Sequence, residues 1–93
     1  MAREATRLII QGRVQGVGYR WWALRRAREL GLAGWVRNRA DGSVEALAIG
    51  APDAIAAFAR SCEVGPPHAV VGTVAASPAA DDGSIAFEQR ESA

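Results

Sequence analysis

Residues 6–31, TRLIIQGRVQGVGYRWWALRRARELG, consist of three successive segments that differ in composition and in the spacing of apolar residues. The run from Thr6 to Gln11 is short, apolar and rich in β-branched residues, which predicts a strand. A loop punctuated by glycines follows from Gly12 to Gly18. Residues 20–31 then carry apolar side chains at helical spacing, and Gly31 suits the end of a helix. A strand, a glycine loop and a helix in this order predict the first part of a βαβ unit.

The chain beyond this stretch alternates in the same way. Residues 33–38 and 44–49 are predicted strands, and Asp41-Gly42 between them is typical of a tight hairpin turn. A second helix is predicted to open at residues 50–53, where Pro suits the first turn and Asp the positive end of the helix dipole. Its core-facing stripe follows the spacing i, i+3, i+4, i+7, at Ile55, Phe58, Ala59 and Cys62.

Two more runs, residues 70–74 and 85–89, predict strands. The order β-α-β-β-α-β then predicts two right-handed βαβ crossovers joined by a hairpin. The expected fold is an α+β sandwich, an antiparallel sheet of four principal strands with both helices on one face. Either of the last two runs can supply the fourth strand, with the other alongside as a short extra edge strand. We expect one domain over residues 1–93.

The composition narrows the function classes. Cys62 is the only cysteine and His68 the only histidine, so neither an internal disulfide nor a Cys/His metal cage is predicted. Without a secretory segment or an apolar run of about 20 residues, we expect a cytoplasmic protein that does not contact membranes. Nine of the eleven arginines lie in residues 1–39 with two acids, whereas residues 40–93 hold two arginines and eight acids. A cationic first half favours an anionic partner, a small phosphate compound or nucleic acid, unless the charges are merely a solvated surface.

The glycine loop leads directly into the N-terminus of the predicted first helix. Helix N-termini have unpaired N–H groups and a positive dipole end, and glycines allow successive N–H groups to converge on one anion. Arg20 at the helix entry would add a planar guanidinium matched to phosphate oxygens. The Gly-Lys-Ser/Thr ending of a Walker loop and the ribose-binding acid of a dinucleotide site are both missing. The loop therefore predicts an anion site, with a simple tight turn as the plainer alternative.

Two segments carry a family resemblance. The segment VQGVGYR, residues 14–20, resembles the first signature of the acylphosphatases, and GWVRN, residues 34–38, followed by DGSVE, residues 41–45, resembles the second. The resemblance covers roughly residues 6–76 and the strand around Phe87, which is nearly the whole chain. It implies the ferredoxin-like form of the fold above and an enzyme that hydrolyses an acyl phosphate to a carboxylate and inorganic phosphate.

The resemblance also implies a mechanism without metal or cofactor. Arg20 would hold the phosphoryl group with its guanidinium, and Asn38 would orient a water molecule for in-line attack on phosphorus. A carboxylate is a good leaving group, so positioning and charge stabilisation remain as the tasks of the protein. The proton of the water would pass to the phosphate, because an amide is no base at neutral pH. Phosphate or sulfate would bind in the same loop, and a monomer is expected. The backbone amides that would contact the phosphoryl group belong to Gln15, Gly16, Val17, Gly18, Tyr19 and Arg20.

Some residues have plainer interpretations. Asn38 alone would be a turn former before the hairpin. Cys62 and His68 could be imagined as a catalytic pair, but a small core residue and a loop histidine are the preferred hypotheses. Asp41 and Glu45 could be imagined as a magnesium site, but a turn and a solvated strand face explain them better.

Two tryptophans do not fit the apolar stripe of the first helix. At about 100° per residue, Trp21 and Trp22 both point away from it. Packing over helix ends or loops is the preferred hypothesis, and a lip on the substrate site or a dimer contact are the alternatives.

Two other functions are compatible with the same sandwich architecture. RNA-binding sheets of this kind expose paired aromatic residues on the middle strands, but residues 44–49 have none and Trp35 alone would make a thin platform. Nucleic acid is therefore not an expected partner. Acylphosphatase-like domains in carbamoyl-transfer or hydrogenase-maturation systems normally head much longer chains with zinc-finger cysteines, which this chain lacks.

Overall fold

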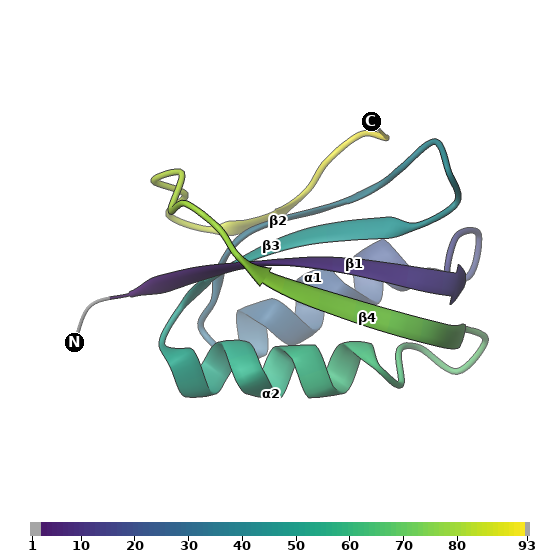
Figure 1. Ribbon diagram of the computed structural model, residues 1–93, viewed down its shortest axis with the longest axis horizontal. Helices are drawn as coiled ribbons and strands as arrows, with labels where there is room; N and C mark the ends of the chain where they lie inside the picture. Colours follow the sequence, from purple (N-terminus) through teal and green to yellow (C-terminus); the bar gives the residue numbers. More distant parts are fainter. Residues whose placement is uncertain (1–2, 93) are drawn as a thin grey trace.

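The computed structural model describes residues 3–92, so the extreme ends of the domain expected over residues 1–93 lie outside the described part. The elements confirm the β-α-β-β-α-β order, and both of the last two predicted runs contain a strand (Figure 1). They are β1 (Glu4–Arg13), α1 (Tyr19–Glu29), β2 (Ala33–Asn38), β3 (Val44–Gly50), α2 (Pro52–Cys62), β4 (Val70–Pro78) and β5 (Phe87–Gln89).

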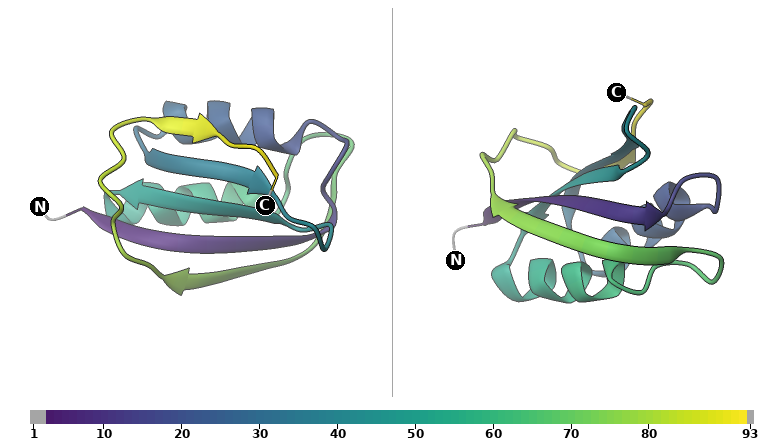
Figure 2. Two further views of the ribbon diagram at one scale, coloured as in Figure 1. Left: turned by 90° about the horizontal axis from the view of Figure 1, so that it is seen from above. Right: turned by 45° about the vertical axis from the view of Figure 1, so that its right-hand side comes forward.

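The sheet has the strand order β4-β1-β3-β2-β5. Each adjacent pair among β4, β1, β3 and β2 is antiparallel, as expected, and β4 is the fourth principal strand because it pairs with β1. The short edge strand β5 is the extra edge strand that the sequence allowed, and it pairs with β2 in parallel, so the sheet as a whole is mixed. The reason is the path of residues 79–86, which crosses from the edge at β4 to the opposite edge, so that β5 enters beside the start of β2 (Figure 2).

Both helices cover one face of the sheet (Figures 1 and 2). The main core lies between them and the sheet, and alternate residues of the strands supply it, as the pleat requires. The first helix contributes the small residues Ala23 and Ala27, which allow its backbone to approach the sheet closely, whereas α2 contributes Ile55, Phe58 and Cys62.

The other face of the sheet is partly covered by residues 79–84. Ala33, Leu47 and Ile49 form a small buried cluster there, and Ala79 packs against it. The indole N–H of Trp35 donates a hydrogen bond to Asp82 at 3.3 Å. A sheet covered in this way offers little open aromatic surface for a nucleobase.

Glu45 corrects one expectation. Its side chain is only 3% exposed, on the face of the sheet opposite the helices, where Arg7 from β1 and Arg37 from β2 both donate hydrogen bonds to it. The expectation of a solvated strand face is wrong because β3 lies between β1 and β2, and both neighbouring strands place an arginine over this carboxylate. Asp41, in contrast, serves the turn as expected, since its carboxylate accepts hydrogen bonds from the Ser43 backbone and hydroxyl.

No helix formed by residues 3–92 is long and apolar enough to cross a membrane.

Candidate active site

The glycine loop curls tightly between the end of β1 and the start of α1. Gly16 and Gly18 have φ angles of 72° and 78°, a left-handed conformation that glycine adopts without strain, and Gly18 is the N-cap of α1. Within the described part of the chain, no backbone N–H from Gln15 to Arg20 donates a hydrogen bond to a protein acceptor. These N–H groups remain available for an anion, at the positive end of the helix dipole.

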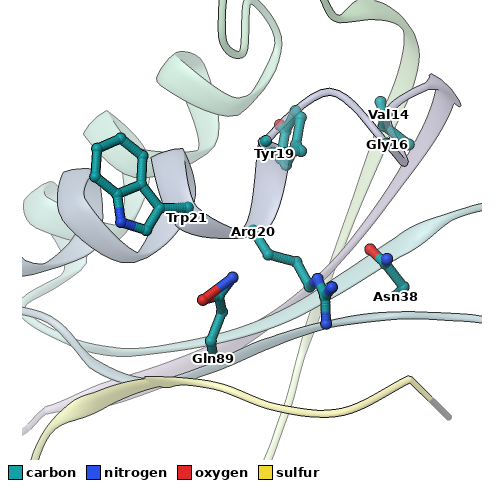
Figure 3. Close-up of a pocket in the computed structure, with 8 residues that line it drawn as sticks. Val14, Gly16, Tyr19, Arg20, Trp21, Asn38 and Gln89 are labelled. Carbon is teal, nitrogen blue, oxygen red and sulfur yellow. The ribbon is translucent and has the colours of Figure 1, made fainter.

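Arg20 is the second residue of α1, and its half-buried side chain crosses toward the sheet (Figure 3). One guanidinium nitrogen donates a hydrogen bond to the Arg90 carbonyl oxygen at 3.1 Å. Among residues 3–92, no carboxylate lies within 4.0 Å of this guanidinium, although several other arginines have such a partner. The positive charge of Arg20 is therefore not neutralised by the protein around it.

A cavity of about 140 Å³ surrounds this guanidinium. It is small compared with the roughly 300 Å³ or more of pockets for larger ligands, and its size suits a phosphoryl group. Asn38, the last residue of β2, directs its amide into the cavity beside Arg20, and Gln89 lies on the other side of Arg20 (Figure 3). The lining residues are Val14, Gly16, Gly18, Tyr19, Arg20, Trp21, Asn38 and Gln89.

Most of the predicted site residues thus meet in one place. Arg20 and Asn38 share the cavity, although they come from the start of a helix and the end of a strand. Gly16, Gly18 and Tyr19 also line it, whereas Gln15 and Val17 belong to the same loop without lining the cavity.

The Gln15 side chain has a different place. Its amide nitrogen donates hydrogen bonds to the carbonyl oxygens of Arg39 and Ser43, both at 2.8 Å. Arg39 directly follows β2 and Ser43 directly precedes β3, so the amide ties the glycine loop to the hairpin that carries Asn38. The sequence motif includes Gln15, but the partners of its side chain follow only from the strand order.

The two tryptophans of α1 lie in different environments. Trp22 packs against the main core and meets the Tyr19 ring edge-to-face, with ring centroids 5.4 Å apart. Trp21 is 56% exposed at the rim of the cavity, and the Arg25 guanidinium lies 4.7 Å from the centre of its ring. The helical wheel placed both tryptophans away from the apolar stripe. This is wrong for Trp22, which packs against the core, whereas Trp21 lies at the rim of the cavity.

Cys62 and His68 are not brought together as a reactive pair. Cys62 is fully buried, and burial raises the pKa of its thiol to about 12, so the thiol stays protonated at neutral pH. His68 is exposed in the loop after α2. The Tyr19 hydroxyl donates a hydrogen bond to the Cys62 carbonyl oxygen at 2.6 Å, which fastens the start of α1 to the end of α2. Burial above all raises the Tyr19 pKa, so this hydroxyl is a structural donor.

Chemically, the cavity combines unpaired N–H donors, an uncompensated guanidinium and two primary amides. Such a set can bind a tetrahedral oxyanion and stabilise charge on its oxygens. No motif in the sequence marks Gln89, because only the parallel pairing of β5 with β2 brings it to the cavity.

Comparisons with known proteins agree with this picture. The acylphosphatase family model matches residues 6–89. A Nitrobacter hamburgensis protein named acylphosphatase is 55% identical over 73 residues, covering 78% of this chain and 74% of the relative. An Acidiphilium cryptum acylphosphatase is 51% identical over 84 residues, covering 87% of this chain and 92% of the relative. The crystal structure of acylphosphatase from Bacillus subtilis superimposes with a TM-score of 0.89 at 37% identity, covering 92% of this chain and 97% of that one.

Proposed function

The chain belongs to the acylphosphatase family, and we propose that Arg20 and Asn38 carry out its hydrolysis of acyl phosphates. The observation that supports these roles most directly is that the Arg20 guanidinium has no carboxylate partner in the described chain and shares a cavity with the Asn38 amide. The Arg20 guanidinium has the charge to bind a phosphoryl oxyanion. The Asn38 amide has the polarity to hold a water molecule.

In the binding step, the phosphoryl group enters the curl of the glycine loop. Unpaired N–H groups of residues 15–20 donate to its oxygens, and the Arg20 guanidinium donates from the sheet side. Preorganised donors cost little reorganisation when negative charge builds up on the equatorial oxygens. The hydrogen bond from Arg20 to the Arg90 carbonyl holds the guanidinium in place before the substrate arrives.

In the chemical step, a water molecule held by the Asn38 amide attacks phosphorus in line with the bond to the acyl oxygen. The P–O bond to the acyl group breaks, its electron pair leaves with the carboxylate, and the proton of the water passes to a phosphate oxygen. The asparagine orients the water without accepting its proton, because an amide is not basic at neutral pH. The loop and Arg20 supply the positive field that the reaction needs, so we propose a metal-independent reaction.

Further proposals concern the state of the protein. We propose that inorganic phosphate or sulfate binds the same loop, since either is a tetrahedral oxyanion with the shape of the phosphoryl group. The single buried Cys62 supports a cytoplasmic protein without a disulfide, and we propose that the enzyme acts as a monomer without contact to membranes or nucleic acid.

The test is hydrolysis of benzoyl phosphate by the purified chain in buffer with EDTA. Wild type should be active. We expect Arg20→Ala to lower kcat/KM by roughly 10³-fold, because it removes the charge that offsets the equatorial oxygens. Asn38→Ala should lower kcat by roughly 10²-fold through loss of water positioning, while inhibition by inorganic phosphate is retained.

Arg60→Ala is the matched control, because Arg60 is an exposed arginine of α2 outside the cavity. It should leave activity unchanged. Full activity of Arg20→Ala, or activity of wild type only with added metal, would contradict the proposed roles.

A further inference from the structure

We propose that Gln89 binds the acyl end of the substrate, with its side-chain amide donating a hydrogen bond to the carboxylate as it leaves. This inference rests on the proposed function and extends the site to a residue outside both sequence motifs. Gln89 ends the three-residue strand β5 and is exposed at the rim of the cavity.

The strand register explains how Gln89 reaches the site. In the parallel pairing of β5 with β2, Gly34 faces Phe87 and Val36 faces Gln89. Phe87 is buried and packs edge-to-face on Phe58 of α2, with centroids 5.8 Å apart, so its side chain lies on the helix side of the sheet. Side chains alternate along a strand, so Gln89 points to the same side.

Asn38 lies on that side as well. It is two residues beyond Val36, which is fully buried in the core under the helices. The two amides therefore project from the ends of neighbouring strands into one cavity, and the Arg20 guanidinium lies between them (Figure 3). The Arg28 guanidinium on α1 donates to the Phe87 carbonyl at 3.1 Å, which fastens β5 beside the helix.

In-line displacement assigns different tasks to the two amides. The attacking oxygen and the leaving oxygen lie on opposite sides of phosphorus. Asn38 and Gln89 lie on opposite sides of the Arg20 guanidinium (Figure 3). When the phosphoryl group binds at this guanidinium and Asn38 holds the water, the acyl oxygen therefore points away from Asn38, toward Gln89.

The chemistry at that end suits an amide donor. As the P–O bond breaks, its electron pair becomes negative charge on the carboxylate, and an N–H donor placed there interacts more strongly with the product than with the ester-like oxygen of the substrate. Gln89 transfers no proton, so the carboxylate leaves in its ionised form. Within residues 3–92, the side-chain amide of Gln89 forms no hydrogen bond and therefore remains available to a substrate.

The test uses a series of benzoyl phosphates with ring substituents that change the pKa of the leaving benzoic acid. Wild type is compared with Gln89→Leu, which removes the donor at similar size, and with Gln89→Glu, which keeps the shape and places a negative charge beside the leaving carboxylate. Gln11→Leu is the matched control, the same substitution at an exposed strand position outside the cavity.

We expect Gln89→Leu to lower kcat/KM about tenfold for the poorest leaving group, a modest loss because a solvent-exposed donor contributes less than a buried one. The loss should be smaller for better leaving groups, because their carboxylates need less stabilisation by a donor. The plot of log kcat/KM against leaving-group pKa should become steeper, while inhibition by inorganic phosphate stays within about twofold of wild type. Gln89→Glu should be at least as impaired, and Gln11→Leu should retain the wild-type slope.

An unchanged slope with either Gln89 variant would overturn the inference and leave the proposed function intact. An equal loss of phosphate inhibition would also overturn it, because Gln89 would then belong to the phosphate end. Failure of wild type to hydrolyse the series, or full activity of Arg20→Ala, would instead reject the proposed function, and this inference with it.

Discussion

Glu45→Gln should destabilise the fold strongly at neutral pH and much less in acid. Glu45 is a buried carboxylate with two arginine partners, Arg7 and Arg37, and the Arg37 contact is 2.7 Å long. A glutamine has nearly the same shape but no charge, and its NH2 group would face one of the guanidinium groups, donor against donor.

The exposure of the partners sets the size of the effect. A hydrogen bond to a charged group contributes about 1.5–3 kcal/mol when it is shielded from water. Here the carboxylate is 3% exposed but the arginine side chains are 45% and 36% exposed, so water can solvate both guanidinium groups after the substitution. We therefore expect a loss of about 2 kcal/mol in total at pH 7, rather than the 3–5 kcal/mol of a fully buried broken pair.

The pH dependence follows from the direction of the Glu45 pKa shift. Burial of the carboxyl group would raise its pKa, but the hydrogen bonds and charges of Arg7 and Arg37 outweigh burial and lower it below the ordinary value. The native state therefore binds this proton at lower pH than the unfolded chain, whose pKa is about 4.3. The stabilisation is complete well above that value, begins to fall as the pH approaches it, and is lost as pH falls through the native pKa.

The assay is urea-induced unfolding of wild type and Glu45→Gln at several pH values from 7 to 3. The difference in the free energy of unfolding should shrink as the pH falls below about 5. Glu88→Gln is the control, since this exposed acid lies 4.0 Å from Arg90 and should cost less than about 0.5 kcal/mol. A difference between wild type and Glu45→Gln that is the same at pH 7 and pH 3 would refute the ion-pair argument and assign the loss to packing.

Three further substitutions test other contacts. Tyr19→Phe removes the 2.6 Å hydrogen bond to the carbonyl at the end of α2 and should lower the free energy of unfolding by about 1–2 kcal/mol. The Tm should fall by roughly 4–8 °C for each kcal/mol lost, and an unchanged Tm would mean that water replaces the hydroxyl. Gly34→Ala should prevent native folding, because φ is +126° and a Cβ would lie 1.8 Å from the Leu47 carbonyl oxygen; a native circular dichroism spectrum and melting curve would contradict this. Gln15→Met removes both hydrogen bonds to the hairpin and should lower kcat for benzoyl phosphate about tenfold, since small misplacements of catalytic groups slow the reaction. A wild-type kcat would show that the hairpin keeps its position without these two hydrogen bonds.

Local patterns in the sequence were sufficient for most of the fold. The second strand was predicted over residues 33–38, where β2 lies, because an apolar core residue and a following Asp-Gly turn define it locally. The second helix was predicted from its proline, its first-turn acid and its apolar stripe, and it runs from Pro52 to Cys62. Signals of this kind depend on neighbouring residues, so they do not need the tertiary structure.

The pairing of the last two strands could not be predicted, because it depends on contacts far along the chain. Both runs are short and β-prone, and neither shows in its own residues which edge it joins. The strand β4 pairs with β1 over most of its length, whereas β5 forms only three pairs with β2. Gln89 belongs to the cavity only through those pairs, which is why the sequence did not identify it.

The candidate site was predicted more fully than the strand pairing, but for a different reason. Arg20 and Asn38 were predicted from two motifs whose resemblance to a family implied that they meet, and elementary physical chemistry gave only an anion site in the loop. The structure adds what neither motif contains, namely the two hydrogen bonds by which Gln15 ties the loop to the hairpin that carries Asn38.

The uneven charge of the chain acquires a structural explanation from the ion pairs. Arginines of the first half reach acids of the second half across the sheet, as Arg3 does with Asp81, and as Arg7 and Arg37 do with Glu45. These pairs neutralise cationic side chains on the face opposite the helices. In the described chain none of these acids reaches the cavity on the helix face, where Arg20 is bound only by a backbone carbonyl. A phosphoryl group bound there, as proposed, would therefore meet a guanidinium that no carboxylate neutralises, so both its charge and its N–H donors would be available to the anion.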